Sequence, residues 1–117
     1  MGRKKGAEEI GIKSEKKVHR ALDILRHNWG EVVRFIHAEK DGDLDRGHVD
    51  FLIFLRSNLS LALQVKSSRW RAKIHLKKYP YIRGVIWIRE RDRPREIAER
   101  IKKIILLYYK RIKRSVN

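Results

Sequence analysis

Several residue types that build specialised sites are missing or scarce in this chain. The 117 residues include no cysteine, one methionine and two prolines. Without cysteine, disulfide scaffolds, cysteine zinc sites and thiol nucleophiles are excluded. The longest apolar and aromatic run, Ile104–Tyr109, is far shorter than the roughly 18 residues that a membrane span needs. Because no apolar segment follows the basic start Met1–Gly6, we expect no secretory signal, no membrane partner and a cytoplasmic location.

Acidic residues are also scarce. The chain has 14 Asp and Glu against 30 Lys and Arg, a formal net charge of +16. Residues 1–58 contribute +2 and residues 59–117 contribute +14. Charged residues make up 38% of the chain, which, with the near absence of Cys and Met, is a composition typical of thermophiles.

The excess positive charge is concentrated in two acid-free stretches. Residues 66–83 and 100–114 each carry seven Lys or Arg. Such clusters attract polyanions, and nucleic acid is the commonest polyanion of a cytoplasm. A solvated charged surface without a partner is the alternative, so charge alone indicates nucleic-acid binding and no chemistry.

The hydrophobic pattern predicts one α/β domain over residues 1–117. Val18, Ala21, Leu22 and Leu25 share one face of a helix expected at about 14–27. Ser14 is a candidate N-cap, and residues 6–9 offer an earlier start. The preceding residues, about 1–11, are expected to form a basic tail.

The rest of the chain alternates strands and helices. We expect strands at 31–38, 48–55, 60–66 and 84–88, and a helix at 69–78 that Pro80 ends. The last helix has Pro94 in its first turn and an apolar stripe from Ile97 to Ile112. The element order is αβββαβα. The middle strands are apolar on nearly every residue, which predicts a sheet covered on both faces.

The second and third strands should form a hairpin with polar residues at its open end. A three-residue loop, Arg56–Asn58, with Asn58 left-handed, places Leu55 opposite Leu59 and Asp50 opposite Gln64, with Lys66 on the same face. A loop shifted by one residue, 57–59, would instead set Asp50 opposite Lys66. Only a loop of even length would separate these polar groups onto opposite faces.

These polar groups are suited to hold a divalent metal ion. The Asp50 carboxylate, the Gln64 amide oxygen and the Val65 carbonyl are the hard oxygen donors that Mg²⁺ or Mn²⁺ prefers. Lys66 would stabilise charge on a phosphate or hold an attacking water. Glu15, on the helix stripe that faces the sheet, would add another carboxylate, and Glu8 or Glu9 would replace it if the helix begins earlier.

This pattern resembles the PD-(D/E)XK nuclease superfamily, which includes restriction endonucleases and archaeal Holliday junction resolvases. The residues that carry the resemblance are Gly47–Asp50, followed by Gln64–Lys66, behind a helix with Glu15. Most members have an acid where this chain has Gln64, and Gln here is similar to Mrr-type restriction endonucleases. With Gln64 in place of an acid, the expected site has one negative charge fewer than in most members.

The resemblance implies a restriction-endonuclease-like αβββαβ core with a mixed central sheet, followed here by the C-terminal amphipathic helix. It also implies a metal-dependent DNA endonuclease acting on branched or modified DNA, with Asp50 as central metal ligand and Lys66 as catalytic lysine. Gln64 and the Val65 carbonyl would complete the metal site, with Glu15 as accessory acid. Many such nucleases are homodimers. Phosphate contacts are expected just after the third strand, from Arg69, Arg71, Lys73, Lys77 and Lys78.

Other interpretations remain open from the sequence. Asp50, Gln64 and Lys66 could form a hydrogen-bonded polar corner without chemistry, and the chain would then be a non-catalytic nucleic-acid-binding module. The basic last helix could instead dock on a larger assembly. The acidic loop 41–45 lacks the glycine and the final Glu of a calcium-binding loop. His37, His48 and His75 show no zinc-ligand spacing, and Trp70 could stack on a base.

Overall fold

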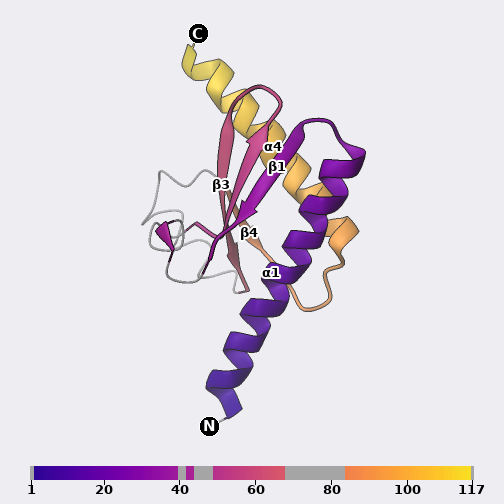
Figure 1. Cartoon of the computed structure of the whole chain (residues 1–117), viewed down its shortest axis with the longest axis vertical. Helices are drawn as coiled ribbons and strands as arrows, with labels where there is room; N and C mark the ends of the chain where they lie inside the picture. Colours follow the sequence, from indigo (N-terminus) through magenta and orange to yellow (C-terminus); the bar gives the residue numbers. More distant parts are fainter. Residues whose placement is uncertain (1, 40–41, 44–48, 68–83, 117) are drawn as a thin grey trace.

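The fold is α/β, with two long helices and a four-stranded mixed sheet (Figure 1). The computed structural model of the chain describes residues 2–39, 42–43, 49–67 and 84–116. The elements are α1 (Gly2–Asn28), β1 (Val32–His37), β2 (Phe51–Leu55), β3 (Ser60–Lys66), β4 (Gly84–Trp87) and α4 (Pro94–Val116). The helix expected at 69–78 lies outside the described residues.

The sheet has the strand order β1-β2-β3-β4, with β1, β2 and β3 antiparallel and β3 and β4 parallel. This arrangement confirms the mixed sheet that the sequence predicts. The β2–β3 loop has the expected three residues, since Leu55 donates its N–H to the carbonyl of Leu59 at 2.8 Å. Asn58 has φ 66°, the left-handed conformation that Asn tolerates better than most residues.

Both helices pack on one face of the sheet. Each strand places alternate side chains on that face, and these form one core with the apolar stripes of α1 and α4. The core residues include Val18, Leu22, Phe51, Ile53, Leu61, Leu63, Ile86, Ile97, Ile101 and Ile105, none more than 2% exposed. Burying a side chain of this size contributes about 1.5–3 kcal/mol. The opposite face, with Leu52, Phe54 and Trp87, is half-buried.

Helix α1 begins at Gly2, so the prediction that it starts near Ser14 is wrong, and the expected basic tail is helical from Gly2 onward. Ser14 lies inside the helix and is buried. Figure 1 shows the reason: the first turns of α1 extend beyond the sheet. Exposed Ile10 and Ile12 there contact no core, so no apolar stripe marks this part of the helix in the sequence.

Helix α4 confirms the prediction for the last segment. Arg93 accepts the Ile97 N–H through its carbonyl at 3.0 Å, so Pro94 occupies the first helical position, where its missing N–H costs nothing. Ile97, Ile101 and Ile105 are fully buried. At the other end of the helix, Tyr108 donates its hydroxyl to the Ser60 carbonyl at 2.9 Å.

A buried carboxylate anchors the start of α4 to the end of β4. Asp92 accepts hydrogen bonds from the Arg89 backbone N–H at 2.8 Å and from the Arg100 guanidinium at 2.9 Å. Arg100 also donates to the carbonyl of Trp87. These contacts fix the direction in which α4 returns across the sheet. Neither helix in the described part of the chain combines the length and hydrophobicity needed to cross a membrane.

Candidate functional site

The candidate site lies at the end of the sheet where β1 and β3 finish and β2 begins. The β2–β3 register pairs Phe51 with Leu63 and Leu52 with Ala62. Asp50 lies just before β2 and outside this register, and its backbone N–H donates to the Leu63 carbonyl at 3.0 Å. Gln64 and Lys66 alternate with the buried Leu63 and Val65, so their side chains are on the face away from α1 and α4.

Strand β2 begins at Phe51, so the prediction that it begins at His48 is wrong for the two described residues Val49 and Asp50. The reason is that Asp50 interrupts the ladder. Its Oδ2 accepts the Val65 backbone N–H at 2.7 Å, a donor that a regular antiparallel pair would direct at a main-chain carbonyl. The Asp50 carbonyl also accepts the Ala38 N–H at 2.8 Å. Asp50 is therefore bound to β3 through its carboxylate and to Ala38, just after β1, through its main-chain carbonyl.

Gln64 has an unusual environment for an amide side chain. It is only 7% exposed, and its Oε1 has no hydrogen-bond partner among the residues that the structure describes. Leaving a buried acceptor unsatisfied costs about 1–3 kcal/mol, so native proteins usually supply a donor, a water or a cation. Among the described residues nothing satisfies this oxygen, so it is available to a further donor or a cation.

Lys66 ends β3 on the same face as Gln64 and is half-buried. Its carbonyl accepts the Ile88 N–H at 2.8 Å, and in the parallel β3–β4 pair it is opposite Trp87. These main-chain contacts fix the strand at the residue from which the ammonium group extends.

Glu15 approaches the same end of the sheet from the helix side. Its Oε1 is 3.1 Å from His37 Nε2, and the His37 ring stacks on Phe51 with centroids 4.2 Å apart. Phe51 belongs to the core face, whereas Gln64 and Lys66 are on the other face. The structure therefore brings Glu15 to the same end of the sheet but on the opposite side from these two residues.

A histidine pair lies beside Glu15, and no sequence pattern predicts it. His19 Nδ1 and His37 Nδ1 are 3.3 Å apart, and His19 Nε2 is 3.7 Å from Asp23 Oδ2. The polar contacts therefore run from Glu15 to His37, from His37 to His19, and from His19 to Asp23. The residues are 18 positions apart on different elements, so only the packing of α1 on β1 reveals the pair.

A divalent metal ion at this site would have to bind oxygen atoms from different kinds of groups. In the parts of the chain that the structure describes, no three His, Asp or Glu side chains form a group that could hold a metal ion. The donors that remain are the Asp50 carboxylate, the orphaned Gln64 Oε1 and the Val65 carbonyl. They match the oxygen preference of Mg²⁺, which takes one or two carboxylates and keeps several waters.

Several of the predicted residues belong to parts of the chain that the structure does not describe. His48, His75, Trp70 and most of the acidic loop 41–45 lie outside the described residues. The same holds for the predicted phosphate contacts Arg69, Arg71, Lys73, Lys77 and Lys78.

Comparison with known proteins adds no relative. A scan against models of protein families finds no match to this chain, and searches of curated proteins and of solved structures find no similar protein.

Proposed function

We propose that this protein is a metal-dependent nuclease that hydrolyses phosphodiester bonds of DNA. The observation that carries the proposal is the buried Gln64 Oε1, which has no hydrogen-bond partner among the described residues and is on the same face as Lys66. A hard cation would satisfy this oxygen, and a lysine beside it suits an anionic substrate.

The residues have distinct roles in this proposal. Asp50, Gln64 and the Val65 carbonyl would hold Mg²⁺ or Mn²⁺, which when bound would activate water and neutralise phosphate charge. Lys66 would orient the scissile phosphate and balance its negative charge. Glu15 has no role in this proposal, because it contacts His37 at 3.1 Å on the other side of the sheet. The resemblance to PD-(D/E)XK nucleases, with its restriction-endonuclease-like core, supports these assignments.

One observation favours a second function, a nucleic-acid-binding module without catalysis. Asp50 Oδ2 accepts the Val65 N–H at 2.7 Å, and this bond gives the carboxylate a structural role without any metal. In this case the polar end of the hairpin would stabilise the sheet, and the basic surface would bind nucleic acid alone.

A cleavage assay distinguishes the two functions. Duplex, single-stranded and branched DNA would be incubated with Mg²⁺ or Mn²⁺ and the wild type, Asp50→Asn, Lys66→Ala or, as a control, the exposed-surface variant Lys103→Ala. We expect Lys66→Ala to lower the cleavage rate about 10²–10³-fold, with DNA affinity unchanged and Lys103→Ala at the wild-type rate. Intact binding without cleavage in the wild type would favour the module.

Metal binding has a readout that is independent of activity. Tb³⁺, a hard cation, would be excited through nearby tryptophan, and Trp87 is opposite Lys66 in the sheet register. We expect Tb³⁺ luminescence that Mg²⁺ competes away and that Asp50→Asn and Gln64→Met both reduce. Luminescence that neither variant reduces would place any bound metal elsewhere.

A further inference from the structure

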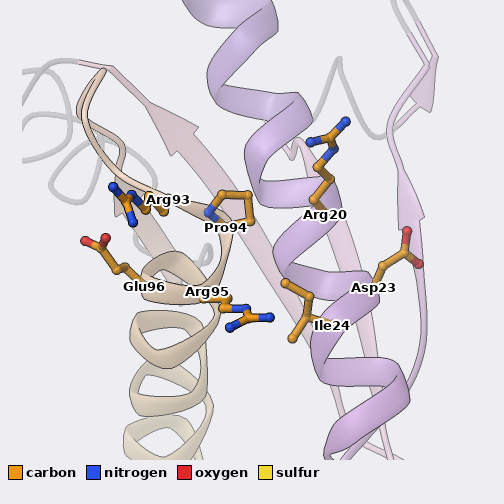
Figure 2. Close-up of a pocket in the computed structure, with 7 residues that line it drawn as sticks. All are labelled: Arg20, Asp23, Ile24, Arg93, Pro94, Arg95 and Glu96. Carbon is orange, nitrogen blue, oxygen red and sulfur yellow. The ribbon is translucent and has the colours of Figure 1, made fainter.

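Two adjoining hollows lie over the outer side of α1 and the first turn of α4. Figure 2 shows the first, about 720 Å³, between Arg20 and Ile24 on α1 and Arg93–Glu96. The second, about 610 Å³, continues along α1 toward His19 and His37. Arg20 and Pro94 line both hollows, so we treat them as one α1–α4 groove. Its cationic residues are Lys13, Lys16, Lys17, Arg20, Arg93 and Arg95.

The positive charge of this groove is mostly uncompensated. Among the described residues, its carboxylates are Asp23 and Glu96, and Asp23 already pairs with Arg26 at 3.3 Å. In the described part of the chain, none of these six cations has a carboxylate within ion-pair distance. Lys17 donates instead to the Glu90 carbonyl. Like charges gathered in a concave surface focus the electrostatic field there and attract anions.

The folded chain, not the local sequence, creates this groove. Lys13–Arg20 and Arg93–Arg95 are more than seventy residues apart, and the packing of α1 against α4 brings them together. The contact of Lys17 with Glu90 and the buried Asp92 hold the two walls in place. The N-terminal end of α4, which carries a partial positive charge, also lies at the groove.

We propose that the α1–α4 groove binds the phosphate backbone of nucleic acid. An acidic protein segment would normally bring apolar or aromatic anchors into a buried pocket, and among the described residues the large apolar side chains that line the groove are Ile24 and Pro94. Backbone binding needs mainly Lys and Arg in reach of successive phosphates. The inference shares its class of partner with the proposed function, but the groove is on the helix side of the sheet, away from Gln64 and Lys66.

The test compares two triple variants that remove the same charges. The groove variant is Lys13→Ala/Lys16→Ala/Arg20→Ala. The control variant, Lys110→Ala/Arg111→Ala/Lys113→Ala, also removes two Lys and one Arg from a helix surface, about 24 Å or more along α4 from Pro94. Binding of a fluorescein-labelled DNA duplex would be measured by anisotropy between about 50 and 200 mM salt. Thermal unfolding would check that both variants fold.

We expect the groove variant to reduce the slope of log K against log[salt] by about 2–3, since each phosphate contact contributes about 0.9. The control should change the slope by less than half as much. A second variant on the other wall, Arg93→Ala/Arg95→Ala, should lower the slope by about 2; it serves as the test if the triple does not fold. Equal losses in groove and control variants would overturn the proposal, as would tighter binding of polyglutamate than of DNA.

Different results test the role of the groove and the role of the nuclease site. Asp50→Asn should keep the wild-type salt slope even if it stops cleavage. If the wild type never cleaves DNA but the groove variants lose binding, the groove proposal stands without the nuclease. If the wild type cleaves and the groove variants bind and cleave normally, the nuclease stands and the groove proposal is wrong.

Discussion

Gln64 is the residue at which the metal proposal can be tested through stability. Gln64→Met keeps the length of the side chain and removes the orphaned acceptor, so without metal we expect the free energy of unfolding to rise by about 1–2 kcal/mol. Adding Mg²⁺ should stabilise the wild type, because a ligand that binds only the folded state raises its stability. It should not stabilise the variant.

Urea unfolding of both proteins, with and without Mg²⁺, measures this coupling. Ser60→Ala, at an exposed position of the same strand, is the control and should respond to Mg²⁺ like the wild type. A variant that is less stable than the wild type in the absence of metal would contradict the interpretation, because it would show that Oε1 has a stabilising partner.

The stability of the protein at acid pH should depend on Asp92. Burial acts against its carboxylate, but hydrogen bonds from Arg89 and the charge of Arg100 outweigh burial, so the pKa of Asp92 lies below its ordinary value of 3.8. A lowered pKa in the folded state contributes stability that is present above the ordinary pKa and is lost as the pH falls through the lowered one. Asp92 therefore contributes to stability at neutral pH and loses that contribution below about pH 4.

The variant Asp92→Asn keeps the shape of the side chain and removes its charge. We expect it to lower stability at pH 7 by about 3 kcal/mol, because it leaves Arg89 and Arg100 without their anion. Below the lowered pKa, wild type and variant should converge. Urea unfolding across this pH range measures the difference, with the exposed Glu96→Gln as control. A constant difference at all pH values would show that packing, not charge, is responsible.

Element boundaries show what a periodic pattern can and cannot predict. Periodicity reports packing, so it identified the part of α1 that touches the sheet and missed the first turns, which extend past it. The start of β2 was missed for a different reason: Asp50 replaces a main-chain acceptor with its own carboxylate, and no apolar pattern signals this exchange. The stripe of α4 was predicted correctly because that helix packs on the core through Ile97, Ile101 and Ile105.

The candidate site was predictable only within the hairpin. There, loop length predicts the register of β2 and β3, and alternation predicts that Gln64 and Lys66 share a face. The lack of a partner for Gln64 Oε1, the contact of Glu15 with His37, and the His19–His37 pair all depend on how distant elements pack. Such contacts form between elements that are far apart in the sequence, so local sequence patterns do not predict them.

The conformation of the β2–β3 loop should affect the stability of the hairpin. Asn58 has φ 66°, a conformation that costs roughly 1–2 kcal/mol for most residues with a Cβ. Asn58→Ala should therefore lower the free energy of unfolding by about 1 kcal/mol, whereas Asn58→Gly should be near neutral. Chemical denaturation of the three proteins measures both differences. Equal losses in Ala and Gly would indicate that a side-chain contact of Asn58, not its backbone, stabilises the loop.

At the scale of the molecule, the net charge of +16 affects folding and binding in opposite ways. Self-repulsion of so many like charges destabilises a compact state, so screening by salt should raise the melting temperature. The expected gain from low salt to about 1 M NaCl, where the Debye length is about 3 Å, is about 1 kcal/mol, or about 4 °C. Over the same range DNA affinity should fall steeply. Calorimetry and anisotropy on the same samples measure both, and a melting temperature that falls with salt would show that ion pairs such as Asp92–Arg100 outweigh the repulsion.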